Sequence, residues 1–212
     1  MAYPIQLILD GLKCVVVGGG KVAARKVEAL CAAGADVHVV SPEFDDELLD
    51  RDDVTRHAEV YRPGLLAGAR LVMICTDDRD VNAQAAADAR AAGALVNVAD
   101  DPEYCDFYVP AVVRRGDVQI AIGTGGASPK LAATLRRRID RAVPEAYAQL
   151  AEELRRIRPV VIDRISDPRE RGRLFARLCD DESLARLADD GQAAWRQWSE
   201  QLLAEAASRH ES

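Results

Sequence analysis

The stretch that decides the fold is "VVVGGGKVAARK", residues 15 to 26. Its three valines form a β-branched run typical of a buried strand, and alanine-rich helical spacing begins at Lys21. Between them, Gly18, Gly20 and Ala23 have the spacing of a tight strand-to-helix turn whose backbone a phosphate can approach. The free N–H groups of the following helix suit a pyrophosphate, so we predict dinucleotide binding at Gly18, Gly19 and Gly20. Glycine-rich turns also occur for packing alone.

Strands and helices alternate along the first half of the chain. Apolar strand patterns cover residues 13–19, 36–42, 54–61, 70–78 and 94–101, and helical patterns cover residues 21–34 and 80–93. Continuous apolar strands joined by helices of this length predict right-handed crossovers and a parallel sheet.

The pattern changes after residue 107. Residues 107–126 read as two antiparallel strands turned at Gly116-Asp117, and residues 128–144 as a helix capped by Ser128 with Pro129 in its first turn. From about residue 145 the spacing is helical throughout. We therefore predict an α/β fold. It comprises a Rossmann-like parallel-sheet domain (residues 1–112), a small α+β region (113–146) and an all-helical C-terminal domain (147–212).

Bulk composition narrows the function classes. The net charge of -7 argues against a general nucleic-acid or membrane binder, because either would need a basic face. The five cysteines are odd in number and form no C-x-x-C pair, which indicates a reducing compartment, the cytoplasm. Asp10 and Lys13 interrupt the apolar N-terminus, so we expect no signal peptide and no membrane span. The three histidines lie far apart in the sequence, so we predict no dedicated metal site.

The second strand lacks the acidic residue that usually binds the adenosine ribose. Ser41 and the backbone at Pro42 could take this role, or Glu43 could. No arginine lies there for a 2′-phosphate, which favours NAD over NADP. Thr76 and Asp77 end the strand at 70–78, where a bound cofactor would pass, although helix capping is an equally good interpretation of Asp77.

Four carboxylates follow the last strand of the first domain, in "NVADDPEYCDFYVPA" (residues 97–111). Ligands in open α/β sheets bind at the carboxyl ends of the strands, so Asp100 should face the same crevice as the glycine turn. Its carboxylate could act as a general base, or ligate a metal ion transiently. For Asp101, next to Pro102, a role in the turn is the better interpretation.

A second glycine loop, "GTGGASPK" (residues 123–130), precedes a helix. Free N–H groups make it a second candidate anion site, although the spacing is not that of a P-loop. Its candidate ligand-binding residues are Thr124, Gly125, Gly126, Ser128 and Lys130. The arginines at 114, 115 and 136–138 could line a basic pocket for a polycarboxylate, or simply form a solvated face.

Taken together, four stretches resemble the N-terminal family of siroheme synthases, which contains precorrin-2 dehydrogenases, some of which are also sirohydrochlorin ferrochelatases. They are "YPIQLILDGLKCVVVGGGKVAARKV", "TDDRDVN", "NVADDPEYCDFYVPA" and "GTGGASPKLAATLRRRI", which extend from about residue 3 to residue 145. The sequence contains no methyltransferase domain, so the expected relative is a short form.

The resemblance implies NAD-dependent oxidation of precorrin-2 to sirohydrochlorin, with metal insertion left open. It implies a homodimer joined through the 113–146 region. It places the family's key aspartate on Asp100, and its cofactor contacts on Lys21 and Val22 and on Pro42 and Glu43. Two alternatives remain: a non-catalytic dinucleotide-binding redox sensor, and an oxidoreductase of small carbonyl substrates with Tyr104 or Tyr108 as its acid–base.

Overall fold

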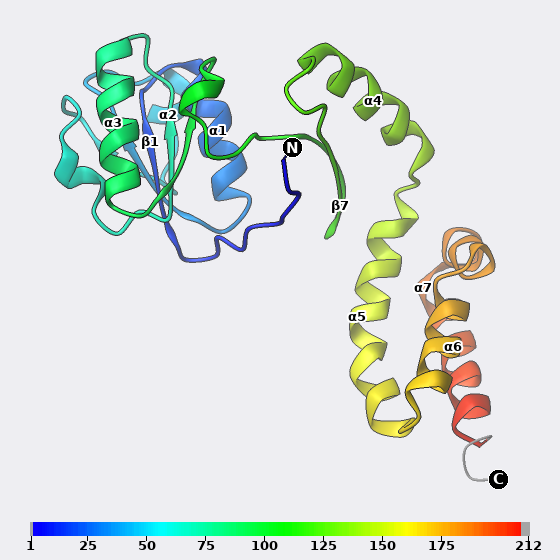
Figure 1. Cartoon of the computed structure of the whole chain (residues 1–212). Coiled ribbons are helices and arrows are strands. Elements are labelled where there is room, and N and C mark those ends of the chain that lie inside the picture. Colours follow the sequence, from blue (N-terminus) through cyan, green and yellow to red (C-terminus); the bar gives the residue numbers. More distant parts are fainter. Residues whose placement is uncertain (1, 209–212) are drawn as a thin grey trace. The chain divides into compact units, whose positions relative to one another are not determined.

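The computed structural model describes residues 2–208. The chain forms two compact units, Met1–Val109 and Pro110–Ser212. The first unit contains β1 (Lys13–Val17), α1 (Lys21–Cys31), β2 (Asp36–Val40), α2 (Asp46–Leu49), β3 (Thr55–His57), η1 (Pro63–Leu66), β4 (Leu71–Ile74), α3 (Arg79–Ala91), β5 (Leu95–Val98) and η2 (Pro102–Tyr104). The second contains β6 (Ala111–Arg115), β7 (Val118–Ile122), α4 (Pro129–Ala142), α5 (Ala146–Arg164), α6 (Pro168–Leu178) and α7 (Asp181–Ser208). Figure 1 shows these elements.

The first unit is a five-stranded parallel sheet with strand order β3-β2-β1-β4-β5. This is the order of a Rossmann-like fold, and it confirms the predicted fold class. The chain reverses its direction of travel across the sheet between β1 and β4, so a ligand crevice is expected beyond the carboxyl ends of these two strands. The predicted strand at 54–61 is shorter than expected, because only Thr55–His57 pair with β2 at the edge of the sheet.

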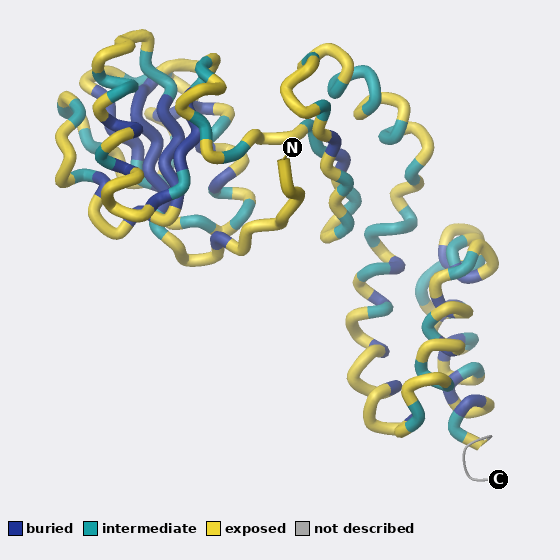
Figure 2. Tube along the Cα trace, in the orientation of Figure 1, coloured by how far each residue is buried: buried dark blue, intermediate teal, exposed yellow. Residues whose placement is uncertain are grey.

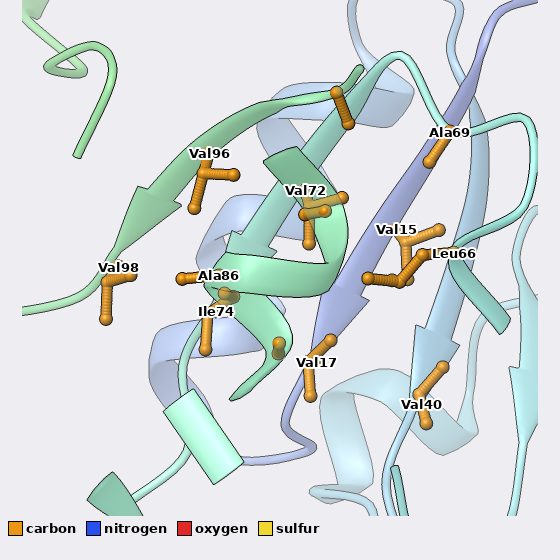
Figure 3. Packing of buried hydrophobic residues seen from close by; sticks show 13 residues of the cluster. Val15, Val17, Val40, Leu66, Ala69, Val72, Ile74, Ala86, Val96 and Val98 are labelled. Atoms are coloured by element: carbon orange, nitrogen blue, oxygen red, sulfur yellow. The ribbon is translucent and has the colours of Figure 1, made fainter. Parts of the chain in front are cut away.

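The strands are apolar on both sides because helices cover both faces of the sheet. One face carries Val15, Val17, Val72, Ile74, Val96 and Val98, which pack with alanines of α3 such as Ala86 (Figure 3). The other face, with Val16, Val39 and Met73, packs against α1. In Figure 2 the strands of this unit form a continuous buried layer. A rigid sheet core therefore fixes the loops at its carboxyl edge.

The second unit begins with the predicted antiparallel ribbon, in which Arg115 pairs with Val118 across a turn where Gly116 has a φ of 54°. Of the helices that follow, α5, α6 and α7 share a core with Ile157, Leu178, Leu187 and Trp195. Trp198 packs against this core from the same helix as Trp195. Gly191 (φ 81°) interrupts α7. The predicted separation of this half into 113–146 and 147–212 stays a prediction.

Candidate dinucleotide and catalytic site

The glycine turn is held between two neighbouring loops. Gly18 has a φ of 118°, and an ideal Cβ built on it would lie 2.6 Å from the carbonyl oxygen of Cys75. A Cβ on Gly19 would collide with the carbonyl oxygen of Glu43 and lie 2.6 Å from the Ser41 Oγ. The first two glycines are therefore required because the loops after β4 and β2 both approach the turn at backbone contact distance.

Gly20 has a different role. It is the N-cap of α1, its φ is −87°, and a Cβ there would meet no atom within 4 Å. No side chain caps α1 and no acidic residue lies in its first turn, whereas Asp45 and Asp78 cap α2 and α3. The first backbone N–H groups of α1, at Lys21 and Val22, remain available to an anion. This open, uncapped cradle fits the pyrophosphate of a dinucleotide.

The loop after β2 forms the second wall. Ser41 is buried, and its backbone N–H donates to the carbonyl of His57 at 3.2 Å. The Asp45 N–H donates to the carbonyl of Gly19 at 2.7 Å, which ties this loop to the glycine turn. Pro42 and Glu43, between these two anchors, are exposed. The residues predicted to contact the ribose thus lie beside the glycine turn.

The loop after β4 is ordered by its own side chains. The Thr76 hydroxyl donates to Asn82 Oδ1 at 2.6 Å and accepts from the Asp78 N–H at 3.2 Å, while Asn82 Nδ2 donates to the Thr76 carbonyl at 2.9 Å. Asp78 caps α3, whereas Asp77 is exposed and makes no side-chain hydrogen bond within the described chain. Our sequence reasoning missed Asn82, although an asparagine in a first helical turn after Thr-x-Asp is a usable signal.

Asp100 follows β5 with a φ of 60°, the only positive φ of a residue other than glycine within residues 2–208. Such a conformation costs about 1–3 kcal/mol and is enriched at functional sites. β5 pairs with β4, so Asp100 lies on the same sheet edge as Cys75 and the glycine turn. The pKa of the Cys75 thiol is raised to about 11, mainly by burial. The positive charge of Lys26 lowers this pKa, and the negative charge of Asp100 raises it. Cys75 is therefore a neutral thiol at neutral pH, and the exposed carboxylate of Asp100 is the better candidate for proton transfer.

Another acidic residue of the 97–111 segment, Asp106, stabilises the loop that follows β5. The Asp106 carboxylate accepts from the Val96 N–H and from Arg90 Nε, both at 3.0 Å. Asn97 Nδ2 donates to the Phe107 carbonyl at 2.9 Å. The segment at Asp106 and Phe107 therefore covers β5, which is an edge strand of the sheet. The Asp101 side chain makes no capping hydrogen bond, and its carbonyl accepts from the Cys105 thiol instead.

The second glycine loop belongs to the second unit. Ser128 caps α4 by accepting from the Leu131 N–H at 3.2 Å, as predicted, and the Thr124 hydroxyl accepts from the Ser128 N–H at 3.3 Å. Gly125 and Gly126 have positive φ values, and Lys130 is exposed. These residues share one loop, so the predicted anion-binding group is brought together within its own unit.

The predicted basic lining is only partly available. Arg115 lies mostly buried and pairs with Asp140 at 3.1 Å, while its Nε donates to the carbonyl of Val143. It therefore holds the ribbon against the end of α4, whereas the arginines at 136–138 are exposed.

Within residues 2–208, no cluster of three or more histidine, cysteine or acidic side chains is arranged to hold a metal ion. None of the described helices is both long and apolar enough for a membrane span.

Comparison with known proteins agrees with this geometry. Residues 5–111 match the model of a family described as "Putative NAD(P)-binding", and residues 115–142 match one described as "Sirohaem biosynthesis protein central". The chain belongs to this NAD(P)-binding family. More particularly, it is a member of the N-terminal family of siroheme synthases, which confirms the resemblance seen in the motifs.

Two relatives illustrate the match. The siroheme synthase of Chromobacterium violaceum is 38% identical over 205 residues, and that of Methylococcus capsulatus is 41% identical over 207 residues. The alignments cover 95% and 96% of this chain but only 44% and 43% of the relatives, so the chain spans less than half of their length. The solved structure of SirC, a precorrin-2 dehydrogenase, has a TM-score of 0.74 at 24% identity and covers 95% of this chain and 98% of its own. This likeness establishes the shared fold.

Proposed function

We propose that the protein oxidises precorrin-2 to sirohydrochlorin with NAD as the oxidant. The observation that carries the proposal is Asp100, an exposed residue whose backbone has a φ of 60°, on the same sheet edge as the glycine turn. Membership of the siroheme synthase N-terminal family supports the choice of substrate, and the name of the structural relative SirC agrees with it.

The residues around the glycine turn would hold the cofactor. The uncapped N-terminus of α1 takes the pyrophosphate, and the loop at Ser41 to Glu43 takes the adenosine ribose. No lysine or arginine occurs from residue 40 to residue 50, which supports NAD over NADP because a 2′-phosphate would find no cation there. When bound, the nicotinamide supplies a hydride acceptor.

Asp100 takes the proton. The oxidation removes two hydrogens from the macrocycle, one as a hydride and one as a proton, and leaves a new double bond in the ring system. The Asp100 carboxylate accepts that proton directly or through water, and then passes it to solvent, to which its side chain is exposed.

The apolar face of α4 bears on the oligomeric state. α4 is strongly amphipathic, yet none of its residues is buried within the described chain, and Leu131 is 49% exposed. We propose that the 113–146 region joins two copies into a homodimer that covers this apolar face. The loop from Thr124 to Lys130, at the start of α4, would bind carboxylates of the substrate.

The test is anaerobic. The purified chain is mixed with enzymatically made precorrin-2 and NAD, and absorbance spectra follow sirohydrochlorin and NADH, with NADP and no-enzyme controls. We expect the two products in equal amounts with NAD. If neither dinucleotide supports oxidation while NAD still binds, the proposal is wrong and the redox-sensor alternative takes its place.

Metal insertion is tested in the same reaction. Insertion requires a base that removes pyrrole protons, and Asp100 is the available carboxylate on this sheet edge. Ferrous or cobaltous ion is added after oxidation is complete. For the comparison, sirohydrochlorin made by the wild-type protein is supplied to every sample, including the no-enzyme control and Asp100→Asn. Faster metallation than in the no-enzyme control, lost in Asp100→Asn, would support a chelatase activity; a rate equal to the control would limit the protein to the oxidation.

A further inference from the structure

A groove runs between α5 and α6 in the second unit, away from the residues assigned above. It consists of two adjoining cavities of about 310 and 360 Å³, which share Arg158 and Phe175 in their linings. Each cavity is within the size range of small-molecule sites. The groove exists because α5 and α6 turn their buried faces, with Ile157 and Leu174, toward the core shared with α7.

The groove is cationic although the protein is acidic. Arg155, Arg158 and Arg171 line it, and no aspartate or glutamate appears in the lining of either cavity within the described chain. Arg155 pairs with Asp117 of the β6–β7 turn. Neither Arg158 nor Arg171 forms a salt bridge with any described carboxylate. Arg171 Nη1 donates to the carbonyl of Ile165 at 3.4 Å, which leaves its other N–H groups for an anion.

The remaining lining is apolar and partly aromatic. The guanidinium carbon of Arg158 lies 5.5 Å from the centroid of the Phe175 ring, a cation–π arrangement that presents a flat surface. Ile162, which is 48% exposed, adds an apolar surface to the same lining. Gly172 leaves the floor of the groove open, since a Cβ there would meet nothing within 4 Å. These features suit a flat apolar body with carboxylates at its rim.

We propose that this groove is a second binding site for a polycarboxylate tetrapyrrole, separate from the site around Asp100. The inference rests on the proposed function, which gives the protein a ligand of this chemistry. The guanidinium groups of Arg158 and Arg171, which have no described carboxylate partner, bind carboxylates at the edge of the macrocycle. The apolar side of the groove, at Phe175, contacts the face of the macrocycle. The groove holds the tetrapyrrole on the helical unit before or after its oxidation.

Cys179 provides a local readout. It lines the second cavity and is the one cysteine of the chain that is exposed, whereas Cys31 is half-buried in the first unit. The full-length chain is treated with a maleimide, with and without uroporphyrin, an air-stable octacarboxylate porphyrin. Peptide mass spectrometry then follows alkylation at both cysteines. We expect saturating uroporphyrin to slow alkylation of Cys179 about tenfold and to leave that of Cys31 unchanged, because the bound macrocycle covers the groove.

Three variants separate the groove from other porphyrin sites. The double variant Arg158→Gln/Arg171→Gln should weaken protection of Cys179 at least about tenfold in uroporphyrin concentration, since it removes both charge-assisted pairs. Gly172→Leu should abolish protection by filling the groove without removing a core contact. Arg173→Gln is the matched control: Arg173 lies on the same helix but outside both linings, paired with Glu170, and protection should stay at the wild-type level.

The outcomes distinguish this inference from the proposed function. If the protein oxidises precorrin-2 but uroporphyrin does not protect Cys179, the proposed second site in the groove is wrong and the proposed activity stands. Protection without oxidation overturns the proposed activity alone. Protection of Cys179 that rises with protein concentration, without porphyrin, would show that a second copy of the chain occupies the groove, and would also overturn the inference.

Discussion

Gly18 and Cys75 are in backbone contact across the point where the strand order of the sheet reverses: an ideal Cβ on Gly18 would lie 2.6 Å from the carbonyl oxygen of Cys75. β1 and β4 are neighbours in the sheet, and their carboxyl ends meet there. The glycine turn is therefore both a packing device and the base of the proposed pyrophosphate site. Substitutions at Gly19 and Gly20 should separate these two roles.

Gly19→Ala should destabilise the protein, whereas Gly20→Ala should reduce only dinucleotide affinity. A methyl group on Gly19 collides with the carbonyl of Glu43, while one on Gly20 enters open space at a φ of −87°. Overpacking of this kind costs about 1–3 kcal/mol, and a neutral substitution less than about 0.5 kcal/mol. Urea unfolding and NAD titration measure the two effects. Equal loss of stability in both variants would contradict this division of roles.

Asp100→Asn should abolish turnover without unfolding the protein. Asparagine tolerates a positive φ about as well as aspartate, so the backbone at 60° is retained while the base is lost. The turnover number should fall by about 100-fold or more, with NAD affinity unchanged. Asp100→Gly is the companion variant: it should lose turnover equally but gain slightly in stability, because glycine relieves the strain. Wild-type turnover in Asp100→Asn would remove Asp100 from the chemistry.

Asp106→Ala should impair activity from a distance. Its carboxylate satisfies the Val96 N–H and Arg90 at the edge of β5, so its removal leaves a buried donor unpaired, at a cost of about 1–3 kcal/mol. The loop that carries Asp100 would lose its anchor, so turnover should fall together with thermal stability. Glu103→Ala, at an exposed position in the same loop, is the control and should change neither.

Much of the fold could be predicted from the sequence because its strands are short, apolar and separated by helices. Three features depend only on residues that are neighbours in the sequence, and the sequence pattern therefore predicts them. They are the glycine turn, the ribbon turn at Gly116-Asp117 and the Ser128 cap. The strand predicted at 54–61 is longer than β3, because β3 lies at the edge of the sheet and only Thr55–His57 pair with β2.

The site was less predictable where long-range contacts decide it. The sequence predicted that Asp100 follows the last strand of the first unit, but it contains no signal for the positive φ. Cys105 and Asp106 contact β5 again just beyond this residue, and such long-range contacts cannot be identified from spacing. Arg115 looked like a ligand-binding arginine, yet Asp140 and the end of α4, 25 residues away in sequence, engage it. Neither partner could be identified from spacing.

The helical unit should lose stability in acid through Glu153. This fully buried carboxylate accepts hydrogen bonds from Arg196 Nε at 2.9 Å and from Arg156 Nε at 2.9 Å, and these bonds hold the pKa of Glu153 below its usual value. A carboxyl whose folded pKa is lowered stabilises the fold above its unfolded pKa, near 4.3, and loses that contribution as pH falls through the folded value.

Glu153→Gln should therefore lower the free energy of unfolding at pH 7 and flatten its dependence on pH below about 4.3. The loss should be about 2 kcal/mol, less than for a fully buried pair, because Arg196 is 45% exposed and can be hydrated. Urea unfolding between pH 3 and pH 7, with Glu170→Gln on α6 as the control, measures it. The same acid dependence in wild type and Glu153→Gln would show that other carboxylates carry it.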